Sequence, residues 1–371
     1  MPAQDGVPLF YPFVPPEAIE EVTSSLQSRW IGQGPKVEIF ESLLQEYIAP
    51  NSSVIATGSG TDSLHLAYIL AGIQEGDEVI TPTFTCTATN IPLLYLRAHP
   101  IFVDIDLQTF NINVHDIEHR ITSKTKAIVA VDYGGIPCDY ATLRSIADKH
   151  GLKLIADCAQ SIGAMFDGKH VSEYADFVAY SFQAIKTITT GDGGALVIND
   201  SATADKAKRL RWFGIDRNAK QMGTWENDIV EVGYKYQLSD IAASVGIASL
   251  KYRHQLLRHR LNLLKIYTEC INHPRVRVVS PFADPRVSSS PWLCTVVAHH
   301  CRKDLMRYLR DRGVESAQVH YRNDRYTIFG GRRHDLPIMD SVEQDYLVLP
   351  VHHMLAESKA REISQMICNF N

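Results

Sequence analysis

The sequence lacks three features that would assign it to a specialised class of protein. It has no apolar stretch of 18 or more residues, which argues against a membrane-spanning helix. Residues 1–16 contain no basic segment followed by a long apolar run, so we expect no signal peptide. Lys and Arg number 37 against 42 Asp and Glu, a net charge of −5, so the basic surplus typical of nucleic-acid-binding proteins is missing.

Cysteine shows no pattern either. Seven cysteines, an odd number, are spread from Cys86 to Cys368 without a CxxC pair, which argues against a disulfide framework and fits a reducing compartment. Of the 371 residues, 45% are hydrophobic and 21% charged, as in an ordinary globular protein. We therefore expect a cytoplasmic chain with two domains, or with one large and one small domain.

The first half of the chain alternates short apolar runs with amphipathic stretches. Strand-like runs lie at 54–56, 78–80, 100–104, 127–131 and 153–157, and helical patterns such as 64–71 and 140–150 separate them. This order predicts βαβ units and an α/β fold with a mainly parallel sheet. Two further strand-like runs, 177–182 and 195–198, have no room for a helix between them and should differ from the preceding units.

The pattern changes near residue 250. Residues 251–271 form a long, basic amphipathic segment, which we interpret as a solvated helix joining two domains; a membrane or calmodulin-binding helix is the alternative. Strand-like runs follow at 276–279 and 294–298. We therefore predict a large domain over residues 1–250 and a small α+β domain over residues 251–371.

Several polar residues follow the predicted strands, and the carboxyl ends of parallel strands are where such sheets bind ligands. Residues 58–62 join a strand to a helix and suit an anion, although a capped turn would look the same. Asp157 ends a strand and is either a cap or a functional carboxylate. Lys186 follows the next strand, beyond Ser181, in apolar company that would lower its pKa; an ordinary surface lysine is the alternative.

Together these elements match the needs of pyridoxal phosphate. That cofactor requires a lysine for a Schiff base, an acid for its pyridine nitrogen and an anion site for its phosphate. The segments 58–62, 157–164, 180–186 and 190–194, supported by 30–40, 77–82 and 233–240, resemble the DegT/DnrJ/EryC1/StrS family of pyridoxal-phosphate-dependent nucleotide-sugar aminotransferases. The resemblance implies a fold-type-I, aspartate aminotransferase-like transferase.

The resemblance also implies roles for matching positions. Lys186 would carry the cofactor as an internal aldimine and shuttle the proton, and Asp157 would pair with the pyridine nitrogen. The remaining contacts would be to the cofactor's ring, ring hydroxyl and phosphate, through Ala159, Gln160, Gly60, Thr61 and Ser181. In this family the site lies at a dimer interface, so Lys235 would reach the phosphate of the neighbouring subunit.

One position departs from the family pattern. Cys86 stands where the family usually stacks an aromatic residue on the pyridine ring, and we expect its thiol to pack there as a small apolar group, with Phe84 as the alternative. For substrate we expect Arg217 to face a diphosphate. His320 and Tyr321 resemble a family segment near the sugar, and a hydrogen-bonded structural histidine is the alternative for His320. His115 and His119 lack the His-Glu-x-x-His arrangement, so we expect no metal.

The expected reaction is a transamination with pyridoxamine phosphate as the intermediate. L-Glutamate would supply the amino group, and the keto group of a nucleotide-linked deoxy sugar would accept it. A dehydratase of the same fold is the nearest competing hypothesis, but that branch replaces the lysine at position 186 by histidine. A lyase of the same fold and a non-catalytic regulator that senses a ligand are two more hypotheses.

Overall fold

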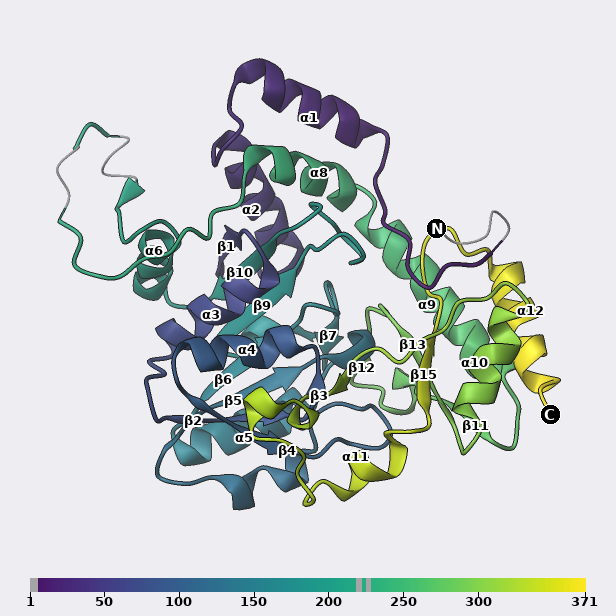
Figure 1. Ribbon diagram of the computed structural model, residues 1–371. Coiled ribbons are helices and arrows are strands. Elements are labelled where there is room, and N and C mark those ends of the chain that lie inside the picture. Colours follow the sequence, from purple (N-terminus) through teal and green to yellow (C-terminus); the bar gives the residue numbers. More distant parts are fainter. Residues whose placement is uncertain (1–5, 218–221, 225–227) are drawn as a thin grey trace.

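The computed structural model describes residues 6–217, 222–224 and 228–371. Its centre is a seven-stranded sheet with the strand order β1-β10-β9-β6-β5-β2-β4 (Figure 1). The pairs from β4 through β2, β5 and β6 to β9 are parallel, and β10 runs antiparallel to both of its neighbours. The predicted mainly parallel α/β sheet is therefore confirmed. The sheet strands are β1 (Ser53–Thr57), β2 (Glu78–Pro82), β4 (His99–Val103), β5 (Thr125–Val131), β6 (Lys153–Asp157), β9 (Phe177–Ser181) and β10 (Gly194–Ile198).

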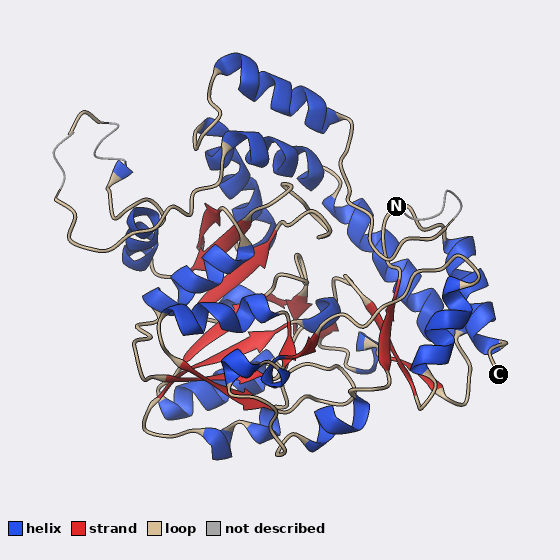
Figure 2. Cartoon of the chain, viewed as in Figure 1, coloured by secondary structure: helices blue, strands red, loops and turns tan. Residues whose placement is uncertain are grey.

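Helices cover both faces of this sheet (Figure 2). Alternate residues of a strand point to opposite faces, so on β6 Leu154 and Ala156 join one hydrophobic core and Ile155 joins the other. The first core includes α2 (Pro35–Ile48), α5 (Tyr140–His150) and α8 (Asp240–Leu250); the second includes α3 (Gly60–Leu70), α4 (Thr87–Tyr95) and α6 (Ser201–Leu210). Burial on both faces explains why the strands are continuous apolar runs.

The C-terminal part has its own sheet and core. The antiparallel strands β11 (Val276–Val278), β13 (Cys294–Ala298) and β15 (Tyr346–Leu349) pack against α9 (Arg253–Cys270), α10 (Arg302–Arg310) and α12 (Glu357–Cys368). In Figure 1 this unit lies at the right, with the C-terminus beside it, and α1 (Glu17–Ser28) lies against α8 at the top of the molecule. The separate cores support a division at residues 250/251, which stays a prediction.

The predicted basic helix at 251–271 is α9, but it is not solvated all round. Leu256 near its start belongs to the core of the large sheet, whereas Leu263, Leu264 and Tyr267 belong to the C-terminal core. Only its outer face is exposed, because a helix that joins two cores buries a stripe in each.

Short strand pairs tie distant segments together. β3 (Phe84–Thr85) pairs with β14 (Tyr321–Arg322), and β7 (Met165–Phe166) lies between β8 (Lys169–His170) and β12 (Val287–Ser288). The helix α11 (Pro337–Val342) follows β14. The β3–β14 pair brings residues near 320 to the carboxyl ends of the parallel strands.

Asp240, at the start of α8, holds the beginning of α2. Its buried carboxylate accepts hydrogen bonds from the backbone N–H groups of Gly34 at 2.7 Å and of Lys36 and Val37 at 3.1 Å each. Hydrogen bonds to charged groups each contribute about 1.5–3 kcal/mol. We expect Asp240→Ala to lower the free energy of unfolding by about 2–3 kcal/mol, measured by urea titration. Asp240→Asn keeps one acceptor oxygen and should lose less stability. An unchanged urea midpoint for Asp240→Ala would contradict the prediction.

Candidate active site

Lys186 lies in the turn that follows β9. Its side chain is partly buried, with Nζ 3.8 Å from the centre of the Trp292 ring. Trp292 is buried, and its indole N–H donates to the carbonyl oxygen of Ile185 at 2.9 Å, which fixes the ring beside the lysine. Burial lowers the pKa of Lys186 to about 8, although the negative charge of Asp157 opposes the shift. Lys186 is therefore not an ordinary surface lysine.

Asp157 ends β6, the strand next to β9 in the sheet. Its Oδ2 accepts a hydrogen bond from the Thr89 hydroxyl at 2.7 Å, and its Oδ1 accepts one from the Ala159 N–H at 3.1 Å. Burial raises the pKa of this carboxyl, whereas the two hydrogen bonds and the positive charge of Lys186 favour the ionised form. The local bond to Ala159 shows that Asp157 also caps its own turn, so the two interpretations of this residue are compatible.

Residues 58–62 form a tight cradle between β1 and α3. The Ser59 hydroxyl caps the helix by accepting from the N–H of Asp62 at 3.1 Å. A Cβ at Gly60 would lie 2.8 Å from Cβ of Ser181, and one at Gly194 would lie 2.4 Å from the carbonyl oxygen of Ser59. Only glycine permits this close approach, which brings the N-terminal end of α3, including Thr61, next to Ser181. A helix N-terminus with an adjacent hydroxyl suits an anion.

Gln160 and His320 face each other across the site. Gln160 accepts from the N–H of Gly134 at 2.8 Å through Oε1, and its Nε2 lies 3.4 Å from Nε2 of His320. The His320 ring stacks on Trp292, with centres 6.1 Å apart. Burial and the nearby Lys186 charge lower the pKa of His320 to about 3, so its imidazole is neutral at physiological pH.

The environment of Cys86 is consistent with its predicted role. The residue is partly buried, precedes α4, and lies close enough to Lys186 to influence its charge. Phe84, the alternative, is buried elsewhere, in edge-on contact with Phe110, Tyr133 and Tyr346. Because the Phe84 ring is engaged in this aromatic cluster, Cys86 is favoured over Phe84 for the predicted contact.

Three of the predicted residues do not join this group within one chain. Arg217 donates to the carbonyl oxygen of Gln33 and lines a separate hollow of about 340 Å³. Lys235 is exposed and donates to the side-chain oxygen of Gln237. Tyr321 is exposed, with the Arg325 guanidinium 4.8 Å from its ring centre, so it turns away from His320 although the two are consecutive.

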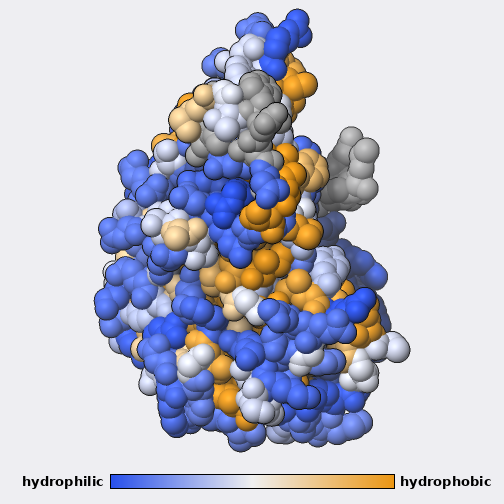
Figure 3. Space-filling model, turned by 90° about the vertical axis from the view of Figure 1, so that its left-hand side faces the viewer, coloured by the Kyte–Doolittle hydropathy of each residue, from blue (hydrophilic) through white to orange (hydrophobic). Residues whose placement is uncertain are grey.

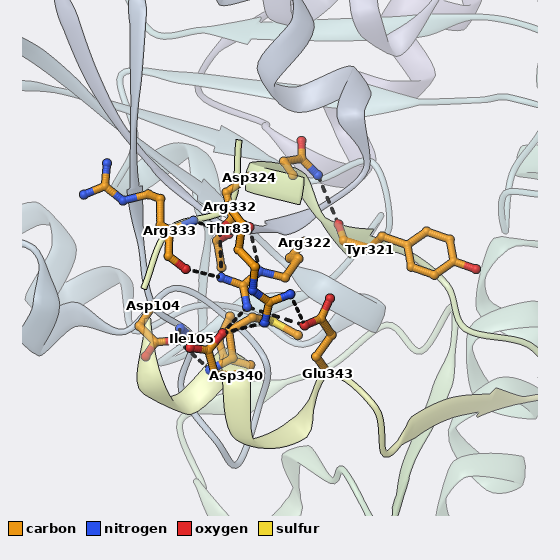
Figure 4. Close-up of polar contacts among 12 residues, drawn as sticks. Thr83, Asp104, Ile105, Tyr321, Arg322, Asp324, Arg332, Arg333, Asp340 and Glu343 are labelled. Atoms are coloured by element: carbon orange, nitrogen blue, oxygen red, sulfur yellow. Dashed lines mark hydrogen bonds and ion pairs between the residues drawn. The ribbon is translucent and has the colours of Figure 1, made fainter. Parts of the chain in front are cut away.

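A buried ionic cluster, missed by the sequence analysis, holds the segment that carries His320. Arg322 is fully buried, and its Nε and Nη2 pair with the two carboxylate oxygens of Asp324 at 2.7 Å each. Its Nη1 pairs with Asp340 of α11 and lies 3.6 Å from Glu343. Figure 4 shows these groups converging while the Tyr321 ring points away. Asp324 also accepts from the Thr83 hydroxyl at 3.0 Å, which links the cluster to the end of β2.

Neither a metal-ligand cluster nor a membrane-spanning helix is found in the described residues. Within residues 6–217, 222–224 and 228–371, no three His, Cys, Asp or Glu side chains are grouped so as to hold a metal ion. In the same ranges no helix is long and apolar enough to cross a membrane.

Comparisons with known proteins agree with this geometry. The model of the DegT/DnrJ/EryC1/StrS aminotransferase family matches residues 14–368. GDP-perosamine synthase of Escherichia coli O157:H7 is 32% identical over 369 residues, 98% of both chains. The uncharacterized protein MJ1066 of Methanocaldococcus jannaschii is 42% identical over 267 residues, 71% of this chain and 69% of its own. The pyridoxal-phosphate form of Spr1654 from Streptococcus pneumoniae superposes with a TM-score of 0.91 at 26% identity over 98% of both chains.

The Arg322 cluster allows a stability prediction. Arg322→Met leaves Asp324 buried without its cation, and breaking such a pair costs about 3–5 kcal/mol. We expect a loss of that size in urea unfolding and a matching fall in Tm. Arg332→Met is the matched control, since this arginine binds the same two carboxylates, Asp340 and Glu343, but is about 43% exposed and should cost about 1 kcal/mol or less. Equal losses in both variants would show that burial of Arg322 does not matter.

The low pKa of Lys186 is also testable. An amine with a pKa near 8 is half unprotonated at pH 8, whereas an ordinary lysine with a pKa near 10.5 is almost fully protonated there. We expect the rate at which trinitrobenzenesulfonate labels Lys186 in the ligand-free protein, followed by peptide mass spectrometry, to rise through an inflection near pH 8. Peptides with exposed lysines serve as internal controls. A Lys186 inflection above pH 10 would contradict the assignment.

Proposed function

Because the chain belongs to the DegT/DnrJ/EryC1/StrS aminotransferase family, we propose that it transfers an amino group from L-glutamate to the keto group of a nucleotide-linked deoxy sugar. The family and its homologues establish the coarser activity, a pyridoxal-phosphate-dependent sugar aminotransferase of fold type I. The observation that carries the proposal is the placement of Asp157 and of the Lys186 amine after neighbouring parallel strands.

The residues of the site fit pyridoxal phosphate. The phosphate would lie in the cradle of Gly60, Thr61 and Ser181, where added Cβ atoms would fill the available space. Lys186 offers an amine with a lowered pKa to the aldehyde, and Asp157 offers a carboxylate to the pyridine nitrogen. The other contacts to the cofactor ring would come from Cys86, Ala159 and Gln160.

The chain's own groups then have defined tasks. When bound, pyridoxal phosphate carries the amino group and withdraws electrons from the substrate carbon. Lys186 Nζ, with a pKa near 8, can take up a proton from the substrate carbon and return it at neutral pH. Asp157 would stabilise positive charge at the ring nitrogen of the bound cofactor. The neutral His320 imidazole, beside Gln160, offers a hydrogen bond to a sugar hydroxyl or keto oxygen.

The substrate is the finer part of the proposal. The name of the E. coli relative, GDP-perosamine synthase, refers to a GDP-linked amino sugar, so GDP-linked keto sugars are the first candidates. Arg217 and Tyr321 stay proposed substrate contacts. Neither lies with Lys186 in one chain, so they would act only where a second subunit or the extended nucleotide brings substrate to them.

A homodimer with shared sites is a further part of the proposal. The segment that leads to Lys235 exposes large apolar side chains, among them Phe213, Ile229, Val230 and Val232. Figure 3 shows hydrophobic patches on the face that carries this segment. We propose that this face meets a second copy and that Lys235 reaches the partner's phosphate.

The seven cysteines, all described and all free thiols, support the proposed cytoplasmic location.

Amine transfer by the purified protein tests the function. With L-glutamate and a panel of GDP-, dTDP- and UDP-linked keto sugars, we expect one amino sugar product by mass spectrometry and accumulation of 2-oxoglutarate. Lys186→Ala should lose at least about 10³-fold in kcat, because it removes both the attachment point and the proton carrier. Lys303→Ala, at an exposed lysine of α10, is the matched control.

Two outcomes would contradict the proposal. The first is transfer by Lys186→Ala at the wild-type rate. The second is bound cofactor with no amino product from any sugar, which would favour the dehydratase or lyase hypothesis.

A further inference from the structure

Thr89 is a buried threonine in the first turn of α4, and none of the motifs above includes it. Its side chain is fully buried, and its hydroxyl donates to Oδ2 of Asp157 at 2.7 Å. The two residues are 68 positions apart in the chain. A buried hydroxyl on a buried carboxylate decides where the remaining lone pairs of that carboxylate can point.

The Thr89–Asp157 bond fixes the direction of a second hydrogen bond, between Thr85 and Thr89. The Oγ1 atoms of Thr85 and Thr89 lie 2.9 Å apart. An ionised carboxylate can only accept hydrogen bonds. The Thr89 hydroxyl has one proton, and it uses that proton to donate a hydrogen bond to Asp157. Thr85 must therefore be the donor to Thr89. The two hydroxyls form a directed chain that ends on Asp157, and each bond polarises the next in these dry surroundings.

Contacts from two distant segments hold this chain of hydroxyls in place. The Tyr68 hydroxyl of α3 donates to the carbonyl oxygen of Thr89 at 2.7 Å. The Asn323 side chain, next to Arg322, donates to the carbonyl oxygen of Thr85 at 2.7 Å and accepts from the Asn90 amide at 2.9 Å. All of these side chains are buried. The hydroxyl that meets Asp157 is therefore preorganised.

We propose that Thr89, oriented by Thr85, is a positioning residue that fixes the ionised Asp157 carboxylate toward the pyridine nitrogen of the cofactor. The inference rests on the proposed function, in which Asp157 meets that nitrogen. Thr89 binds Oδ2 and the Ala159 N–H binds Oδ1, so one donor on each oxygen sets the plane of the carboxylate. The remaining lone pairs of the Asp157 carboxylate are then the ones available to the pyridine nitrogen.

The test separates action through Asp157 from ordinary packing. Apoprotein of the wild type, Thr89→Val and Thr89→Ser is titrated by equilibrium dialysis with pyridoxal phosphate and with 1-deazapyridoxal phosphate, in which CH replaces the ring nitrogen. Thr89→Val should raise the Kd for pyridoxal phosphate about tenfold or more, because it removes a hydrogen bond to a charged group. Its Kd for the deaza analogue should stay within about twofold of the wild type, since the analogue has no nitrogen for Asp157 to meet. Thr89→Ser should keep both affinities near those of the wild type.

Matched controls keep the result interpretable. Thr125→Val removes another buried hydroxyl, at the opposite end of a parallel strand, and should change neither Kd. If Thr89→Val does not fold, as shown by thermal unfolding of the apoprotein, Thr85→Val replaces it. That variant removes only the donor to Thr89 and should give a smaller loss that is again confined to pyridoxal phosphate.

Each contrary result has a distinct meaning. If Thr89→Val weakened the binding of both cofactors equally, or if Thr89→Ser did not restore the affinity for pyridoxal phosphate, Thr89 would be a packing residue and the inference would be overturned. Unchanged affinity for both would overturn it as well. Either result leaves the proposed function intact, because amine transfer by the wild type tests that separately. A wild type that binds both cofactors equally would show that Asp157 does not meet the ring nitrogen, and the inference would fall with that contact.

Discussion

The parallel pairing of β6 with β9 is the constraint on which the rest of the site depends. Asp157 lies opposite Ala179 in this pair, so the carboxylate that ends one strand and the lysine turn that follows the next emerge at the same edge. Parallel strands need long connections, and here the connection between β6 and β9 contains β7 and β8. The chemistry is therefore assembled by backbone pairing rather than by residues adjacent in sequence.

Burial changes the pKa values of both Asp157 and Lys186. The dry surroundings raise the pKa of Asp157 and lower that of Lys186, and each charge partly offsets the shift of the other. A lone buried charge of either sign would be costly. The hydrogen bonds from Thr89 and Ala159 then favour the ionised acid, while Lys186 retains a pKa close enough to neutrality to exchange protons.

The C-terminal part of the chain reaches the Lys186 region by returning to the large sheet. Phe10 and His320 both stack on the ring of Trp292, with centres 5.4 Å and 6.1 Å from it. The Arg322 cluster holds the segment beyond His320 rigid, and Asn323 connects it to the hydroxyl chain behind Asp157. The groups proposed to face substrate and those proposed to face the cofactor therefore share one buried polar framework.

Local sequence patterns were enough to predict the mainly parallel sheet, the turn at 58–62 and the choice of Asp157 and Lys186 as candidate site residues. Continuous apolar strands and strand-end polar residues are local patterns, and the family motifs occupy contiguous stretches. The contacts of Thr89, Trp292 and Asp324 became visible only in the folded chain, because Thr89–Asp157, Trp292–Ile185 and Thr83–Asp324 are 68, 107 and 241 positions apart. The tertiary structure also separated His320 from Tyr321, since consecutive residues of an extended segment point to opposite sides. Periodicity and motif spacing record which face of an element is buried, whereas packing between distant elements decides which side chains meet.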